Sequence, residues 1–277
     1  MFTLRSFATI GLALVLGTSL SAQWPRYEVP GVPRTADGRP DLDAPAPRAP
    51  DGRPDLSGIW QNYRPPTQQV RSVNAGFFDD LPPTLINEFR DIGSGLKDGL
   101  PLQPWAAALK KERMDANSMD NPDAHCLPLG IMQLHTHVDP RRILQTPQLI
   151  AFIYEANYGL RQIYLDGRPA PDNDPQPWWY GDSRGRWEGD TLVVETTNIR
   201  DGGWLDINGS PQTDAATITE RFRRPNYGTL SIEVTVDDPK AYTRPWTVTL
   251  TQRLMVDSEM MEFICNENEK SSQHYVR

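Results

Sequence analysis

Segments in which apolar and polar residues alternate fill the second half of this chain. In residues 217–224, Ile218 and Phe222 lie on the opposite face from Thr219 and Arg221. Residues 230–236 place Leu, Ile and Val side chains on one face and Ser, Glu and Thr side chains on the other. A period of two residues is typical of an antiparallel strand with one buried face. Strands of this kind, joined by short turns, close into a barrel or a sandwich.

The alternating segments are separated by Gly, Asn, Asp and Pro turns, such as residues 188–190 and 225–228. About eight sequentially paired strands is the number at which a barrel can hold one small ligand. We therefore predict an all-β fold with a minor helical part, built as an antiparallel up-and-down β-barrel. The predicted strands are residues 142–145, 149–156, 161–166, 185–187, 191–197, 217–224, 229–236, 246–255 and 260–266.

Two segments before these strands have the pattern of helices. In residues 83–90, Leu85, Ile86 and Phe89 follow helical spacing, and residues 104–117 begin with a proline in the first turn. We expect one or two helices that cap or flank the barrel.

The N-terminal residues 1–22 have the features of a secretory signal peptide. One early cation, Arg5, precedes an uncharged apolar stretch and then small residues around positions 19–22. The apolar stretch is shorter than the roughly 20 residues of a membrane-spanning helix. We expect a protein that is periplasmic or secreted, without a transmembrane segment.

Residues 23–57 are rich in proline and contain the hexapeptide Asp-Gly-Arg-Pro-Asp-Leu twice, at 37–42 and 51–56. Proline prevents regular strand pairing, and two copies are too few for a solenoid. We expect an extended arm that either lies on the barrel or is disordered. Residues 58–277 then form the barrel domain.

The cysteine content and the net charge restrict the environment and the partners. Cys126 and Cys265 lie in the exported part of the chain, where an oxidising compartment favours a disulfide between them. Two separate buried thiols are the alternative. The 28 Lys and Arg against 36 Asp and Glu give a net charge of -8, which argues against nucleic acid or an anionic membrane as the main partner.

Several longer phrases resemble a large family of exported bacterial proteins, most of which have no assigned function. They are Asp-Gly-Arg-Pro-Asp-Leu-Ser-Gly-Ile-Trp at 51–60, Asn-Pro-Asp-Ala-His-Cys-Leu-Pro at 121–128, Gly-Arg-Trp-Glu-Gly-Asp-Thr-Leu-Val-Val-Glu-Thr at 185–196, Thr-Glu-Arg-Phe at 219–222 and Cys-Asn-Glu-Asn at 265–268. The resemblance implies no particular activity. It implies histidines at three places that hold Ala170, Asp182 and Gln212 here. Any chemistry of those imidazoles is then lost or replaced in this chain.

A second likeness, to lipocalin-type barrels, comes from the triplet Gly58-x-Trp60 near the start of the domain. It implies a lipocalin-like architecture and is a likeness of fold alone.

Five polar residues on or beside the predicted strands are candidates for catalysis: Glu155, Arg161, Tyr164, Asp166 and Arg221. The default explanation for such groups is a set of outward salt bridges between neighbouring strands. The alternative is that some of them point into an apolar cavity. Burial would there raise the pKa of a carboxyl group so that it acts as a general acid or base, and an arginine would stabilise a developing anion.

Aromatic residues are concentrated around the long turn after Asp174-Pro175. Half-exposed aromatic side chains at a barrel mouth close over a ligand or plug the end of the barrel. We take five of them as ligand-binding candidates: Trp178, Trp179, Tyr180, Trp187 and Trp204.

Two further patterns have an ordinary explanation that we prefer. Residues 181–185 match the Gly-x-Ser-x-Gly pattern of hydrolases, but a β-hairpin follows where that motif requires a helix. His135, His137 and Asp139 would share one face of an extended segment and could bind zinc or iron, although a surface loop leading to Pro140 is the simpler interpretation. We expect no metal and no cofactor.

These observations leave three hypotheses for function. The first is binding of a small apolar or aromatic molecule in the barrel. The second is a cofactor-independent lyase, isomerase or hydratase that uses a buried carboxylate and an arginine in the same cavity. The third is a structural or interaction module of the cell envelope, which would leave the barrel filled by side chains.

Overall fold

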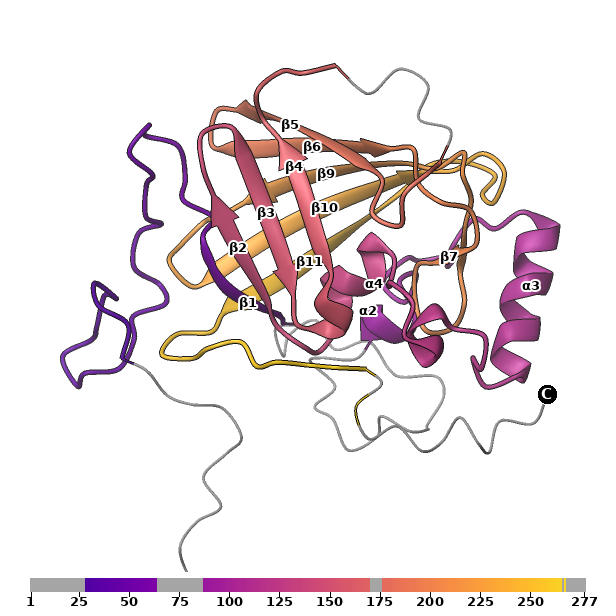
Figure 1. The fold of residues 1–277 in the computed structure, drawn as a ribbon, viewed down its shortest axis with the longest axis horizontal. Helices are drawn as coiled ribbons and strands as arrows, with labels where there is room; N and C mark the ends of the chain where they lie inside the picture. The colour runs from indigo at the N-terminus through magenta and orange to yellow at the C-terminus, as the bar shows by residue number, and fades with distance from the viewer. Residues whose placement is uncertain (1–27, 64–86, 170–175, 266, 268–277) are drawn as a thin grey trace, which may run out of the picture.

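The computed structural model describes residues 28–63, 87–169, 176–265 and 267. The predicted signal peptide, residues 1–22, lies outside the described residues, as does Ala170. Nine strands close into one barrel in the order β1-β11-β10-β9-β6-β5-β4-β3-β2 (Figure 1). The barrel strands are β1 (Gly58–Asn62), β2 (Arg141–Gln145), β3 (Leu149–Tyr154), β4 (Leu160–Tyr164), β5 (Asp182–Glu188), β6 (Thr191–Thr197), β9 (Thr217–Arg223), β10 (Thr229–Asp237) and β11 (Trp246–Leu254).

The predicted all-β barrel is therefore confirmed, and it is antiparallel except at one seam. β4 and β5 run parallel and share only two register pairs, Ile163 with Ser183 and Tyr164 with Arg184. The connection between them is long enough to return the chain to the start of β4 before β5 begins. Buried side chains alternate with more exposed ones along β2, β3, β4, β9 and β10, and the inward apolar set of the barrel is fully buried. It includes Ile143, Phe152, Ile163, Leu192, Val194, Ile218, Phe222 and Ile232.

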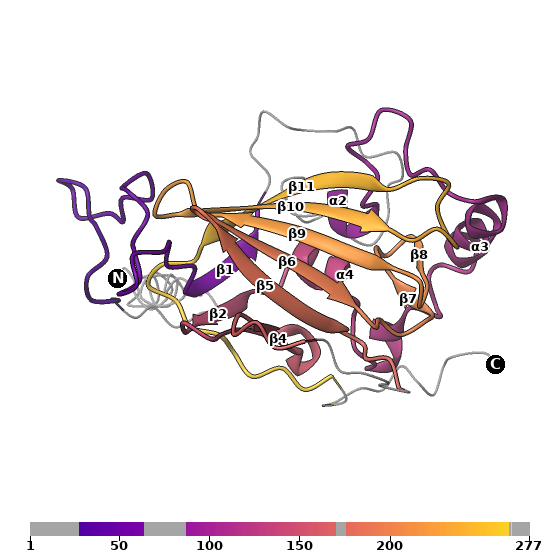
Figure 2. The same cartoon turned by 90° about the horizontal axis from the view of Figure 1, so that it is seen from above.

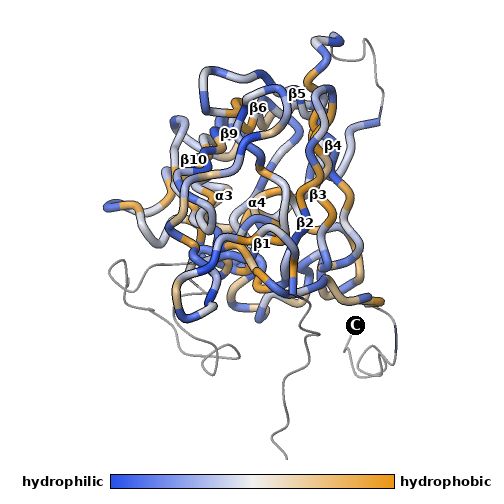
Figure 3. Tube along the Cα trace, turned by 90° about the vertical axis from the view of Figure 1, so that its left-hand side faces the viewer, coloured by the Kyte–Doolittle hydropathy of each residue, from blue (hydrophilic) through white to orange (hydrophobic). Residues whose placement is uncertain are grey.

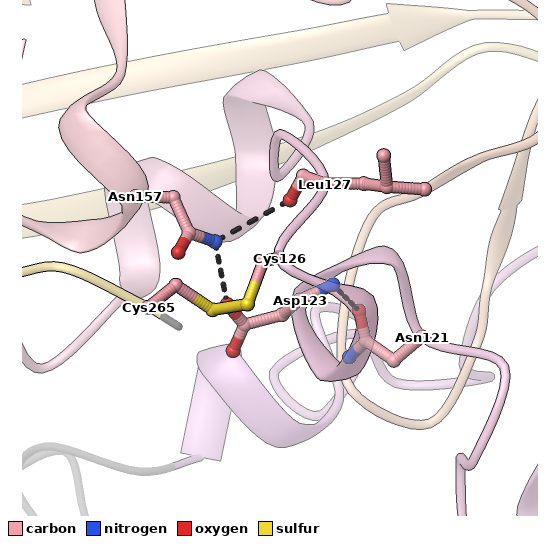
Figure 4. Close-up of a disulfide and its surroundings, with 6 residues drawn as sticks. All are labelled: Asn121, Asp123, Cys126, Leu127, Asn157 and Cys265. Atoms are coloured by element: carbon pink, nitrogen blue, oxygen red, sulfur yellow. Dashed lines mark hydrogen bonds between the residues drawn. A yellow bond between two sulfur atoms is a disulfide. The ribbon is translucent and has the colours of Figure 1, made fainter. Parts of the chain in front are cut away.

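Eight of the nine predicted strands correspond to β2, β3, β4, β5, β6, β9, β10 and β11. The prediction for residues 260–266 is wrong, because the described residues 260–265 form no strand. This segment is held instead by the Met261 amide, which donates to Glu155 (2.9 Å), and by the predicted disulfide between Cys126 and Cys265, which is present (Figure 4). β1 closes the barrel in its place, pairing with β2 and β11.

The helices lie in two different positions. α3 (Pro104–Asp115) begins at a proline as predicted and flanks the barrel at the end opposite the N-terminal arm (Figures 1 and 2). α4 (Ile131–Thr136) was not predicted and lies inside the ring of strands (Figure 3). All six of its residues are buried. The other elements are α2 (Asn87–Arg90), the short helical turns η3 (Pro122–His125) and η4 (Ala156–Tyr158), and a two-stranded sheet of β7 (Gly203–Trp204) and β8 (Pro211–Gln212).

The described part of the proline-rich arm, residues 28–57, lies on the barrel. This is the first of the two predicted alternatives. Its repeated hexapeptides form the same small loop twice, closed by a bridge between Arg34 and Pro40 and by one between Arg48 and Pro54. Each loop is fastened to a different turn of the barrel. Arg34 pairs with Asp257 (2.9 Å) and Arg48 with Asp190 (2.7 Å).

Among the described residues, no helix combines the length and the apolar character that crossing a bilayer demands.

Candidate functional site

A cluster of polar side chains lies inside the barrel, built from four neighbouring strands. β4, β5, β6 and β9 each turn one polar residue inward, at a position where the alternation of the strand would place an apolar one. These residues are Arg161, Ser183, Thr196 and Glu220, and all are buried. His135 reaches the same point from α4.

Glu220 is the centre of this cluster. Its Oε1 accepts hydrogen bonds from Nε2 of His135 (2.6 Å) and from Nη1 of Arg161 (2.9 Å), while Nη2 of Arg161 donates to its Oε2. The guanidinium also donates from Nε to Ser183 (3.1 Å) and from Nη2 to Thr196 (2.9 Å). The bidentate contact and the hydroxyl partners together give each nitrogen of Arg161 a hydrogen-bond acceptor, which favours the burial of such a pair.

The charges of the cluster follow from this geometry. Burial alone would raise the pKa of Glu220, but the charge of Arg161 and the hydrogen bonds from His135 and Arg161 outweigh it and lower the pKa to about 2. Burial lowers the pKa of His135, so its imidazole is neutral at pH 7. An ionised carboxylate only accepts hydrogen bonds, so Nε2 of His135 carries the proton and Nδ1 is the unprotonated nitrogen.

The position of His135 depends on how α4 is held. Nη1 of Arg141 donates to the carbonyl oxygens of Leu134 (3.1 Å) and His135 (2.5 Å). The side-chain amide of Gln252 also donates to the carbonyl oxygen of His135 (3.2 Å). These donors satisfy carbonyl groups at the end of a short buried helix, which would otherwise lack partners. Arg141 and Gln252 therefore fix the helix, and with it the imidazole, inside the barrel.

Within the described part of the chain, Nδ1 of His135 is buried and has no hydrogen-bond partner. The buried hydroxyl of Tyr154 lies near the guanidinium of Arg161 and interacts with it. Phe152 lies between His135 and Tyr154, with its ring 5.9 Å from that of His135 and 6.0 Å from that of Tyr154. Burial raises the pKa of Tyr154 to about 12, so its hydroxyl remains protonated.

A cavity of about 340 Å³ opens in the barrel wall next to this cluster, at the parallel seam. Arg161 and Ser183 belong to its lining, together with Tyr164 and Asp182. Because β4 and β5 share only two register pairs, they separate beyond the seam, and the segment before β5 covers the opening. The volume lies within the range of about 300–1,000 Å³ that is usual for small-molecule sites.

Three consecutive aromatic residues, Trp178, Trp179 and Tyr180, form the other side of this cavity. The amide of Trp178 donates to Asn198 (3.1 Å), which fastens the segment beside the end of β6. Gly181 then turns the chain into β5 with a φ of 60°. A side chain there would place its Cβ 2.5 Å from the carbonyl oxygen of Thr197, so the tight turn requires glycine.

The predicted ligand-binding residues therefore divide into two groups. Trp178, Trp179 and Tyr180 are gathered at one cavity. Trp187 and Trp204 lie elsewhere: Trp187 packs under Arg53 of the arm, and Trp204 is buried in β7 beneath Arg113.

The five predicted catalytic residues are not brought together. Arg161 alone enters the polar cluster, while Tyr164 lies at the cavity between Arg168 and Arg184. Glu155 holds the amide of Met261. Asp166 pairs with Arg168, and Arg221 pairs outward with Glu188 (3.1 Å). Both are surface salt bridges, which is the default explanation for such groups.

The segment that holds His135, His137 and Asp139 is not extended, so the three side chains do not share one face. His135 belongs to α4 and faces the barrel interior, whereas His137 follows the helix and packs against Phe89 at 4.8 Å. The described residues contain no group of three His, Cys, Asp or Glu side chains that could hold a metal ion. Ser183 lies within a strand rather than on a turn before a helix, so the nucleophile geometry is also missing.

Two of the places where the resemblance implies histidine are buried in this chain. Asp182 lines the aromatic cavity and pairs with Arg184, and Gln212 lies in β8. These positions do not locate the interior cluster, but another signal in the sequence could have done so. Glu220 lies between Ile218 and Phe222 on the apolar face of its strand, where a charged residue is unusual.

No protein-family model, curated protein or solved structure matches this chain.

His137 makes stability depend on pH. Burial is the main reason that its pKa falls from 6.5 to about 4 in the folded chain, with the charge of Arg141 acting in the same direction. The unfolded chain therefore binds the proton first, so stability is fully present above pH 6.5 and is lost as the pH falls towards 4. We expect a loss of about 3 kcal/mol over this interval.

Urea unfolding at a series of pH values measures this loss. His137→Asn should remove the part of the dependence that His137 contributes and leave the part that buried His135 contributes in the same direction, whereas His125→Asn, at an exposed histidine, should keep the whole dependence. An unchanged pH profile in His137→Asn would show that another group is responsible.

Proposed function

We propose that this protein binds a small, uncharged aromatic or apolar molecule in the cavity at the β4–β5 seam. The observation that carries the proposal is the convergence of Trp178, Trp179 and Tyr180 on a cavity of about 340 Å³. Three adjacent aromatic side chains supply a large apolar contact area and ring faces for stacking. A pocket with apolar and aromatic walls and a few polar groups is the usual form of a small-molecule site.

The charges beside the cavity favour an uncharged ligand. Arg161 is neutralised by Glu220, and Asp182 by Arg184. Each nitrogen of Arg161 already donates to a barrel side chain, and Glu220 neutralises its charge, so the guanidinium does not favour an anionic ligand. Hydrogen bonds from Ser183 or Gln162, in the lining of the cavity, would fix the orientation of a ligand, while the aromatic rings supply the affinity.

The place of binding differs from the one expected from sequence, because α4 occupies the barrel interior. The enzyme hypothesis has less support than the binding hypothesis, because the polar cluster is buried. His135 and Glu220 have no exposed surface, so a substrate in the cavity would meet Arg161 and Ser183 before either of them.

A larger cavity of about 440 Å³ lies between the arm and the turn after β11. Its most buried ionisable residue, Arg224, donates to the carbonyl oxygens of Asp55, Ser57 and Tyr227. These bonds fasten the arm to the barrel, so we assign this cavity no part in the proposed function.

Titration with the fluorescent probe N-phenyl-1-naphthylamine tests the proposal. We expect saturable 1:1 binding to the exported chain, with the affinity reduced about 10- to 30-fold in Trp178→Ala, because a tryptophan at the centre of a site carries a large share of the binding energy. Trp105→Ala is the matched control. Trp105 is 47% exposed and Trp178 45%, but Trp105 lies on α3, away from the cavity. Equal affinities for the two variants would refute this site.

A further inference from the structure

The exposed apolar side chains of this protein are not scattered over its surface. Eleven large hydrophobic residues are exposed among those described, and seven of them lie around the aromatic cavity and the disulfide. We call these seven the apolar strip: Leu127, Tyr158, Leu160, Trp178, Met261, Phe263 and Ile264. An exposed apolar patch of this kind usually marks a binding surface.

The apolar strip is continuous with the cavity. Leu160 and Trp178 belong to both, and Pro128, which follows Leu127, also lines the cavity. Tyr158 connects this end to the segment after β11, because its hydroxyl hydrogen-bonds to the backbone of Phe263. A molecule that leaves the cavity past Leu160 therefore meets further apolar side chains of the strip.

Covalent and hydrogen bonds hold the apolar strip in place. The disulfide joins Cys265, next to Ile264, to Cys126, next to Leu127 (Figure 4). The amide of Asn157 donates to Asp123 (2.7 Å) and to the carbonyl oxygen of Leu127 (3.3 Å), and Glu155 holds the Met261 amide. The backbone of the strip is thus held in place before any ligand arrives, which lowers the entropic cost of binding.

The ionisable groups beside the Tyr158 and Met261 part of the apolar strip are acidic. Glu155 accepts a hydrogen bond from the Met261 amide, Asp123 accepts one from the side chain of Asn157, and Glu262 lies beside Tyr158. At the cavity end, Arg200 lies over the ring of Trp179 at 5.0 Å and is a cation. An acidic border disfavours an anionic tail such as a fatty carboxylate. It leaves an uncharged hydrocarbon chain as the occupant that the strip accommodates best.

We propose that the apolar strip extends the ligand site and that the ligand is an aromatic molecule with an uncharged alkyl chain. The ring lies in the cavity against Trp178 to Tyr180, and the chain runs along the strip towards Phe263 and Ile264. This inference rests on the proposed function, since it requires the ring to occupy the cavity.

Isothermal titration with 4-alkylphenols, from 4-ethylphenol to 4-octylphenol, tests the proposal on the disulfide-bonded protein. Each added methylene should strengthen binding about two- to threefold, because each covers apolar surface of the strip. Phe263→Ser and Ile264→Ser should reduce this gain per methylene by at least about half and leave the affinity for 4-ethylphenol unchanged. Leu144→Ser, at an exposed leucine of β2 outside the strip, should keep the full gain.

The outcomes separate the two proposals. If 4-ethylphenol binds and its affinity depends on Trp178, but the longer phenols bind no more tightly, the extension is wrong and the cavity site stands. The extension is also wrong if the gain per methylene is the same in Phe263→Ser, Ile264→Ser and Leu144→Ser. If no member of the series binds, both proposals fail.

Discussion

Replacing Glu220 with alanine is expected to lower the free energy of unfolding by about 3–5 kcal/mol. The change would leave the guanidinium of Arg161 buried without its carboxylate partner and would remove the hydrogen bond to His135. Urea unfolding followed by tryptophan fluorescence measures the effect. Ser183 and Thr196 would still accept hydrogen bonds from Arg161, but neutral hydroxyl groups do not compensate a buried charge.

Two controls make this expectation specific to the buried pair. Glu233→Ala removes an exposed glutamate from the neighbouring strand β10 and should change stability by less than about 0.5 kcal/mol. The double variant Arg161→Met with Glu220→Leu should be more stable than Glu220→Ala, because it removes both charges together. If Glu220→Ala unfolds at the same urea concentration as the original protein, the ion pair does not contribute to the fold.

Removing the disulfide is expected to have the second large effect. Cys126 and Cys265 are separated by 139 residues, and a cross-link over a loop of this length restricts the unfolded chain by about 5 kcal/mol in the chain-entropy model. We expect the double variant Cys126→Ser with Cys265→Ser to lose between about 2 and 5 kcal/mol.

The same experiment under reducing conditions provides the control. Dithiothreitol should destabilise the original protein to the level of the double serine variant and should leave that variant unchanged. A double variant as stable as the oxidised protein would mean that the two cysteines are not cross-linked in solution.

The strands could be predicted because their signal is local. One face of each barrel strand is buried, so the period of two residues is visible in the sequence of residues 217–223 or 229–237 without knowledge of the partner strand. Residues 260–266 have the pattern of a strand but form none in their described part, for a physical reason. Met261 and Phe263 alternate with Glu262 as in a strand, but they belong to an exposed strip rather than to a buried face.

α4 could not be predicted because it is short and buried on all sides. A helix that faces water on one side shows a period of 3.6 residues, and Ile131–Thr136 has no such exposed side. Its helical form depends on Arg141 and Gln252, which lie on strands and donate hydrogen bonds to its terminal carbonyl oxygens only in the folded chain.

The interior cluster was only partly visible from sequence for a related reason. His135 and Glu220 are 85 residues apart, and Arg161 and Glu220 are 59 apart, so no local motif contains them. Each of the strand residues does occupy an inward position by alternation. A charged residue at such a position is the sign of a buried pair, although the sequence does not reveal which residue is its partner.

The closure of the barrel sets the order in which this fold can be completed. β1 pairs with β2 and β11, so its register pairs join Trp60 to Leu254 across almost two hundred residues of chain. During synthesis, the β1 edge stays without its second neighbour until residues 252–254 have emerged. An incomplete chain therefore exposes an open sheet edge that can pair with other molecules, and a chaperone that shields residues 58–62 would protect it.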